Sequence, residues 1–172
     1  MKRYLLCTTI MVTSLSLFIT PITMAFDKWE GLSTEEARTV VRLLDDLYKH
    51  YVVFDTINHV ENQGRVPAAT TTKQVFKEME KRGWHSARLI TTTDKFFNPE
   101  NKPKDDFEKE AVQALSAGKD YFEKVETVDS KRSLRAATPV PAVLKECTMC
   151  HVYAKEGELM GAIVYTISIK QE

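Results

Sequence analysis

Near its C-terminus the chain carries Cys147-Thr148-Met149-Cys150-His151. Two thiols separated by two residues can each add to one of the two vinyl groups on a haem, and this spacing is typical of c-type haem attachment. A histidine that follows directly supplies an imidazole as the fifth ligand of the iron. The motif therefore predicts one covalently bound haem c, held by Cys147 and Cys150, with His151 as the proximal ligand. It also requires a short turn at this point of the fold.

Three other uses of the same residues compete with haem attachment. In an oxidising compartment, Cys147 and Cys150 can form a structural disulfide. A thioredoxin-like redox pair has the same spacing, but it normally follows an early strand, and this pair lies close to the C-terminus. A zinc site needs about four ligands, and only three candidates are clustered here. The adjacent histidine and an export signal together favour haem c.

The first 25 residues have the pattern of that export signal. Lys2 and Arg3 precede an apolar stretch at 5–19, and Thr23-Met24-Ala25 fits a cleavage site before Phe26. We predict a signal peptide at 1–25, which would take Cys7 with it, and a single domain at 26–172 in the periplasm of a Gram-negative bacterium. Retention of the stretch as a membrane anchor is the alternative, although its Ser and Thr content is unfavourable for a span.

Overall charge narrows the choice of partners. Lys plus Arg and Asp plus Glu both number 24 among 172 residues. No excess of positive charge points to nucleic acid as a partner. The expected partners are haem and a periplasmic redox protein that the sequence does not name, and the mature form is not expected to span a membrane.

Two helices are predicted in the first half of the mature chain. Ser33 and Glu36 have the spacing of a capping box, and the helix that they open is expected to run to about Val60, because Gly64 is typical of a stop. Apolar residues recur along it at spacings of three and four, which predicts a stripe that faces the core: Val40, Leu43, Leu44, Leu47, Tyr51, Phe54 and Ile57. A second helix is predicted from Thr72 to Arg82.

The remaining segments favour strands around one more helix. Residues 85–92 alternate, with His85, Ala87 and Leu89 on one face and Arg88 and Ile90 on the other. A helix capped at residue 105 is expected to reach about residue 117, and residues 121–128 and 132–137 fit a hairpin around a polar turn. The β-branched run 161–169 suits a final strand. The predicted fold class is α+β: a long N-terminal helix plus an antiparallel sheet, with the haem motif inserted before the last strand.

Several segments also resemble a known family. In chain order they are Pro67-Ala68-Ala69-Thr70, Gly83-Trp84, Arg88-Leu89-Ile90, Asn98-Pro99-Glu100-Asn101-Lys102-Pro103, Phe107-Glu108, Leu134-Arg135-Ala136-Ala137-Thr138-Pro139, the haem motif, Gly157-Glu158 and Gly161-Ala162. The chain is similar to small bacterial haem c domains of PAS-like fold, named after a cyanobacterial cytochrome-like protein. One departure is Phe97, where the family loop often has arginine. The resemblance implies haem c on a PAS-like sheet, in free cytochromes or in extracytoplasmic inputs of membrane receptors.

The ligand on the other side of the iron separates an electron carrier from a gas binder, because an open site binds diatomic molecules. Some relatives use a cysteine, but the mature chain has none to spare. His85 is the first candidate, because it shares a strand face with the small Ala87. His50 lies within the apolar stripe, and His59 lies on the opposite, polar face of the same helix. Met79, Met160 and a five-coordinate iron are further alternatives.

Haem propionates need cationic or amide partners. Arg135, on the strand that leads toward the motif, and Arg88 are the candidates, although both can equally be strand residues in surface ion pairs. The function expected from these features is a periplasmic monohaem c-type cytochrome for electron transfer. The alternative is an extracytoplasmic haem-based sensor of NO, CO or redox state. We do not expect an enzyme, because the sequence offers no recognisable distal acid and base.

Overall fold

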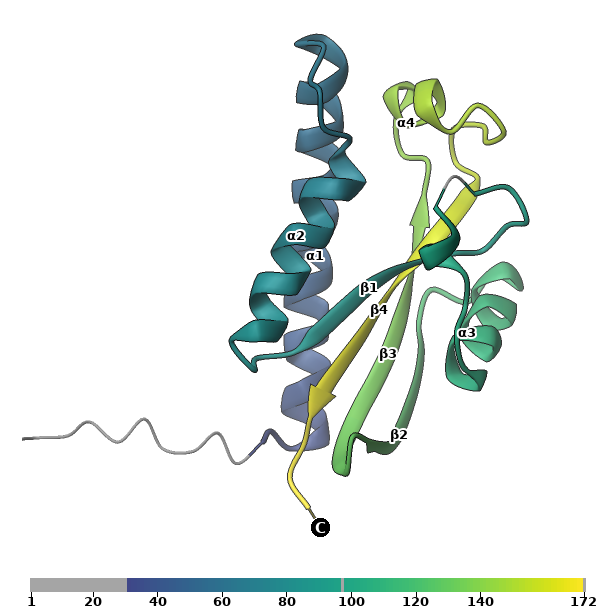
Figure 1. Cartoon of the computed structure of the whole chain (residues 1–172). Coiled ribbons are helices and arrows are strands. Elements are labelled where there is room, and N and C mark those ends of the chain that lie inside the picture. The colour runs from purple at the N-terminus through teal and green to yellow at the C-terminus, as the bar shows by residue number, and fades with distance from the viewer. Residues whose placement is uncertain (1–30, 97, 172) are drawn as a thin grey trace, which may run out of the picture.

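In the computed structural model, residues 31–96 and 98–171 are described. The predicted signal peptide at 1–25 and the departure at Phe97 lie outside these residues. The elements, shown in Figure 1, are α1 (Thr34–Glu61), α2 (Ala68–Lys81), β1 (Ser86–Thr91), the short 3₁₀ helix η1 (Pro99–Asn101), α3 (Asp106–Ser116), β2 (Phe122–Val128), β3 (Lys131–Pro141), α4 (Lys145–Cys150) and β4 (Leu159–Ser168). This order confirms the predicted α+β class.

The four strands form one sheet in the order β1-β4-β3-β2, and every neighbouring pair is antiparallel. The last strand is therefore central and lies between β1 and β3. The predicted hairpin is confirmed: β2 and β3 are joined at Asp129 and Ser130, which both have positive φ, +48° and +63°. Two consecutive residues of this kind give a turn whose twist matches that of the strands.

Alternating strand residues build a core on each face of the sheet. On one face, α1 and α2 cover Leu134, Ala136, Ile163, Tyr165 and Ile167. On the other face, α3 packs through Phe107, Ala111 and Leu115 against Ile90, Ala137, Ala162 and Val164. The predicted alternation along β1 is confirmed, since Ala87 and Leu89 lie on the α1 side and Ile90 lies on the α3 side.

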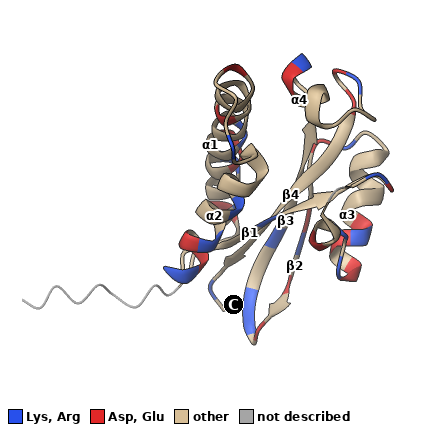
Figure 2. Cartoon of the chain, turned by 45° about the horizontal axis from the view of Figure 1, so that its top comes forward, with Lys and Arg blue, Asp and Glu red and all other residues tan. Residues whose placement is uncertain are grey.

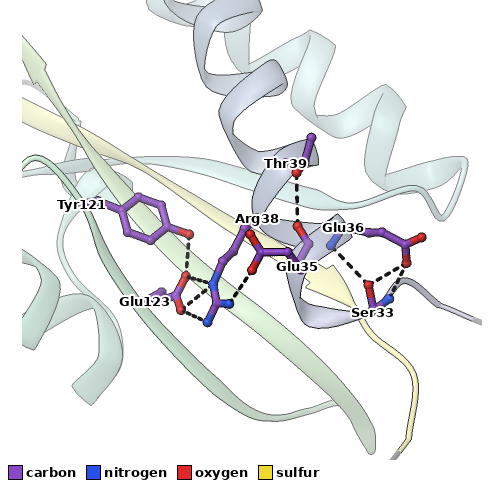
Figure 3. Close-up of polar contacts among 7 residues, drawn as sticks. All are labelled: Ser33, Glu35, Glu36, Arg38, Thr39, Tyr121 and Glu123. Carbon is purple, nitrogen blue, oxygen red and sulfur yellow. Dashed lines mark hydrogen bonds and ion pairs between the residues drawn. The ribbon is translucent and has the colours of Figure 1, made fainter.

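The start of α1 is fixed by a cap and by an ion pair to the sheet (Figure 3). The Ser33 hydroxyl accepts from the Glu36 N–H, and the Ser33 N–H donates to the Glu36 carboxylate, which confirms the capping box. One turn on, Arg38 donates to Glu123 of β2 at 2.6 and 3.0 Å, and Tyr121 donates to the same carboxylate. The hydrogen bonds from Arg38 lower the pKa of Glu123.

The face of α1 that meets the sheet differs from the prediction. Its buried residues are Ala37, Val41 and Tyr48, and the Asp45 carboxylate beside them accepts from Thr138 and Tyr165 of the sheet. Four residues of the predicted inward stripe are exposed instead: Leu43 (68%), Leu47 (59%), Tyr51 (38%) and Phe54 (66%). We call these four residues the outer stripe. The prediction is confirmed for Val40 and Leu44, which pack against the core. It was wrong for the outer stripe, because the contact face also uses the small Ala37 and the polar Asp45 and Tyr48, which an apolar count does not favour.

Two element boundaries also differ from the sequence prediction. The second helix begins four residues earlier, at Ala68 after an N-cap at Pro67. Strand β3 continues past Ala137 to Pro141, although prolines usually end strands. Its neighbour β2 stops at the pair Phe122–Ala137, so that edge of β3 is open beyond this point. An open edge tolerates proline, because no ladder hydrogen bond is lost there.

Within the described ranges, no helix is long and apolar enough to cross a membrane. This finding does not extend to residues 1–30, where the predicted apolar stretch lies.

Candidate haem attachment site

The Cys-x-x-Cys-His motif lies in an excursion between the two central strands, above the end of the sheet (Figure 1). Strands β3 and β4 stay paired up to Pro141 and Leu159. At the base of the excursion, the Ala142 N–H donates to the Glu158 carbonyl, and the Gly157 N–H donates to the Ala142 carbonyl, both at 2.8 Å. Ala142 is fully buried. The insertion is therefore closed tightly at its base, as the predicted position before the last strand requires.

Within the excursion, the two cysteines lie on the short helix α4. Residues three apart on a helix project from the same side, so Cys147 and Cys150 share one side of α4. Both are free cysteines: Cys147 is half-buried and Cys150 is exposed. No disulfide bond joins these two cysteines in this structure. The two thiols are thus presented together, on one side of α4.

His151 follows as the C-cap of α4, and its N–H donates to the Cys147 carbonyl at 3.0 Å. Its ring Nδ1 lies 2.9 Å from the hydroxyl of Tyr153, and the two rings are nearly perpendicular. Burial lowers the pKa of His151 and raises the pKa of Tyr153. A neutral imidazole is the form that binds a metal. In ligating histidines, the second ring nitrogen is normally held by a hydrogen bond, and Tyr153 has that position here.

Tyr153 is a site residue that the sequence analysis missed. Its hydroxyl also interacts with Thr93, in the loop after β1. The contact links the motif to a segment about 60 residues earlier in the chain. A tyrosine two residues after the histidine carries no spacing signal of its own, so only the fold reveals its role.

Large apolar side chains are exposed around the motif. Val143 is 48% exposed, Met149 61% and Val152 78%. All three flank or interrupt the Cys-x-x-Cys-His sequence. Apolar side chains that gather in this way commonly mark a binding surface.

Of the three histidine candidates for the sixth ligand, His85 lies far from the motif. It precedes β1, where Ser86 pairs with Thr166, whereas the motif adjoins the other end of β4, at Leu159. Seven residues of strand separate these two levels, which is about 23 Å at 3.3 Å per residue. His85 is instead buried in the core, where its Nε2 lies 2.9 Å from the hydroxyl of Tyr48. The structure does not bring His85 and His151 together.

The other two histidines exchange their predicted positions on α1. His50 belongs to the outward side of the helix and is exposed, with its Nδ1 2.7 Å from the Asp46 carbonyl. His59 follows Tyr48 by eleven residues, about three turns, and therefore lies on the same inward side. The loop at Gly64 covers its Nδ1, which is buried without a hydrogen-bond partner among the described residues. The sequence expectation, which put His50 inside and His59 outside, was wrong because it used the outer stripe as the core-facing reference.

A model of one known family matches residues 32–168, which is most of the chain. The chain belongs to the Tll0287-like family. The match covers all the described helices and strands, from α1 to β4, and it confirms the resemblance drawn from the sequence segments. Among curated proteins, no sequence matches this chain.

In this Tll0287-like domain, the two arginines predicted to meet the propionates lie near each other. Arg88 and Arg135 lie on the α3 face of the sheet, around the fully buried Glu108. Arg88 Nε is 3.1 Å from the Glu108 carboxylate, and Arg135 bonds to Asp105 at 2.9 Å and to Glu126 at 2.8 Å. Figure 2 shows the two signs of charge gathered on α3.

This network holds α3 against the sheet. The Arg135 guanidinium also lies 4.3 Å from the centre of the Phe107 ring, and Arg88 donates to the carbonyls of Glu100 and Lys102. Both cations are therefore engaged by protein groups on the α3 face of the sheet. The structure brings Arg88 and Arg135 to each other, and neither to Cys147 nor to His151 by any hydrogen bond or ion pair found in the described residues.

The residues around the motif nevertheless fit a haem. Two free cysteines share one side of α4, an imidazole whose pKa is lowered by burial follows directly, and exposed Val143, Met149 and Val152 would offer apolar contact to a porphyrin. Zinc or another bare ion is less suited, since no three His, Cys, Asp or Glu side chains within 31–96 and 98–171 are placed to hold one. The donor set therefore matches covalent haem c in chemistry.

Proposed function

We propose that this Tll0287-like protein is a periplasmic monohaem c-type cytochrome that carries electrons. The observation that carries the proposal is the arrangement on α4, where two free cysteines on one side are followed directly by the half-buried His151. Cys147 and Cys150 would hold haem c through thioethers, and His151 would be the proximal ligand. When bound, the haem supplies a one-electron Fe(III)/Fe(II) couple.

The protein's own part is to orient the imidazole. His151 Nδ1 is engaged by the Tyr153 hydroxyl, so we assign Nε2 as the nitrogen that faces the iron. A hydrogen bond at Nδ1 fixes the tautomer and the ring orientation. The clamp at Ala142, Gly157 and Glu158 keeps the excursion in place relative to the sheet. A rigid site of this kind limits rearrangement on electron transfer and suits a carrier.

For the sixth ligand we propose His59. It lies on the inward side of α1, in the last turns of the helix, and α1 is in contact with α4. The two elements stand beside each other at the same end of the molecule in Figures 1 and 2. Nδ1 of His59 is buried beneath the Gly64 loop, which leaves Nε2 as the nitrogen to bind iron. His85 and His50 are the matched controls. His85 is buried at the end of the sheet away from the motif, and His50 is exposed on α1.

Absorption spectra of the haem-loaded protein test the carrier function. A filled sixth site predicts a six-coordinate, low-spin spectrum in the reduced form that carbon monoxide does not change. His59→Ala should convert it to a five-coordinate form that binds carbon monoxide, and His85→Ala and His50→Ala should not. Rapid, tight binding of carbon monoxide or NO by the unmodified protein would favour the sensor alternative over the carrier.

Export has a separate test. If the signal peptide is removed as proposed, the protein recovered from the periplasm begins at Phe26, which N-terminal sequencing identifies. A protein that keeps residues 1–25 and stays with the membrane would favour the anchor alternative.

A further inference from the structure

The outer stripe of α1 is an apolar surface that nothing in the described structure covers. Leu43, Leu47 and Phe54 are each more than half exposed, and Tyr51 is 38% exposed. Because the sheet and α2 contact α1 from its other sides, the stripe forms a continuous band along the helix. Single exposed apolar residues are common on proteins, but contiguous bands mark interaction surfaces.

Three members of the outer stripe, with His50 and Ile57 beside them, have the spacing of a coiled-coil seam. Along the outward side of α1, Leu43, Leu47, His50, Phe54 and Ile57 follow each other at intervals of four, three, four and three residues. A repeat of 3.5 residues keeps these side chains in one seam along the helix. Such a seam fits a second helix better than a flat surface. The helix has 28 residues, about 42 Å at 1.5 Å per residue, which is enough for several turns of helix-to-helix packing.

We propose that two copies of this chain associate through their α1 helices, outer stripe against outer stripe. The seam is self-complementary, since a two-fold axis beside α1 sets one copy of the repeat against an identical one. From Leu47 onward it carries few charges: in residues 47–60, only Lys49 and Asp55 are charged, and neither belongs to the stripe. The exposed Asp46 flanks the first turn of the stripe, between Leu43 and Leu47. Lys49 pairs with Asp45, and Asp55 accepts from Thr71 of α2. Over residues 47–60, two identical stripes can therefore approach without repulsion between like charges.

The exposed area of the stripe reaches the lower bound for a specific interface. The four stripe side chains expose roughly 500 Å² per copy, so pairing would remove about 1,000 Å² from water, the lower bound for a specific interface. His50, Ile57 and the neighbouring helix surface would add to this area. The inference does not depend on haem, because none of the stripe residues belongs to the motif at 147–151.

The oligomeric state of the protein, purified as cells produce it, tests the inference. Light scattering after size-exclusion chromatography and sedimentation velocity are measured from about 1 to 100 μM. We expect a dimer that dissociates on dilution. Leu47→Glu combined with Phe54→Glu should raise the dissociation constant at least about 100-fold, because two charges would be buried in the seam. Circular dichroism should show unchanged helix content.

Val66→Glu is the matched control, because Val66 is 46% exposed but lies outside the stripe, in the loop after α1. It should leave the dimer intact. Replacement of Cys147 and Cys150 by alanine should also leave the dimer intact, which separates this inference from the proposed haem chemistry. A monomer at all concentrations, a monomer that binds lipid vesicles, or a dimer that survives the double glutamate substitution would each overturn the inference.

Discussion

Replacement of Arg135 by methionine tests whether this arginine serves the fold or the haem. Methionine keeps the apolar stem and removes the guanidinium. In the structure, Arg135 bonds to Asp105 and Glu126 and lies over Phe107, on the α3 face of the sheet. If this description is correct, the substitution should destabilise the protein and leave the haem spectrum unchanged.

The expected loss follows from the contacts. Asp105 and Glu126 are partly exposed, 47% and 35% at their side chains, so each pair contributes about 0.5 kcal/mol. Stacking on Phe107 contributes roughly 0.5–1 kcal/mol. Glu108 is 2% exposed and would keep Arg88 as its only ion-pair partner among the described residues, which costs about another 1 kcal/mol. The total is about 2.5–3 kcal/mol, or a Tm lower by about 7–9 °C.

Urea and thermal unfolding followed by circular dichroism measure this loss, beside the haem absorption spectrum. Lys124→Met is the matched control: it removes an ion pair to Glu110 in which both side chains are substantially exposed, so it should cost less than about 0.5 kcal/mol. Arg135→Met should also cost about 1 kcal/mol less when Glu108 is already Gln, because the two residues are coupled. A loss as small as that of Lys124→Met, or an altered haem spectrum at unchanged stability, would refute this description of Arg135.

Three further outcomes are expected. Gly161→Ala should lower the free energy of unfolding by about 1–3 kcal/mol, measured by urea titration, because a Cβ there would lie 2.5 Å from the Ile90 carbonyl oxygen; an unchanged value would contradict the close packing of β1 and β4. Burial lowers the pKa of His85 from its usual 6.5, so the unfolded chain binds a proton that the folded chain does not, and stability should fall as the pH drops below about 6.5; urea unfolding at pH 7.5 and 5.5 should show a smaller decrease for His85→Gln, and an equal decrease would be inconsistent with this assignment. Tyr153→Phe should shift the reduction potential of the haem-loaded protein in a voltammetric measurement, because it removes the hydroxyl at His151 Nδ1, whereas the same potential in both proteins would exclude that role.

Local signals in the sequence predicted the elements well where a side chain directly satisfies the backbone. Ser33 and Glu36 form the capping box, and the Asp105 side chain accepts from the Glu108 N–H at the start of α3. Asp129 and Ser130 make the predicted hairpin turn. These contacts join residues close in sequence, so their chemistry is visible without the fold.

Tertiary partners explain what the sequence did not predict. Hydrogen bonds between Asp45 and the sheet and between Tyr48 and His85 determine which face of α1 points inward. The periodicity of apolar residues does not reveal such pairs. The same error placed His50 inside and His59 outside. Arg88 and Arg135 looked available for propionates, because their carboxylate partners on α3 and β2 are distant in the sequence. The attachment motif itself needed no fold to be recognised, since all its residues are adjacent.

The most direct test of the central claim is whether the haem is covalently held by Cys147 and Cys150. The protein is produced with the cellular machinery for haem c attachment, denatured, and separated from free haem before the pyridine haemochrome spectrum is recorded. The unmodified protein and a Met149→Ala control should retain a haem c spectrum, and Cys147→Ala combined with Cys150→Ala should retain no haem. Haem that is lost on denaturation of the unmodified protein, or that persists in the double variant, would contradict the claim.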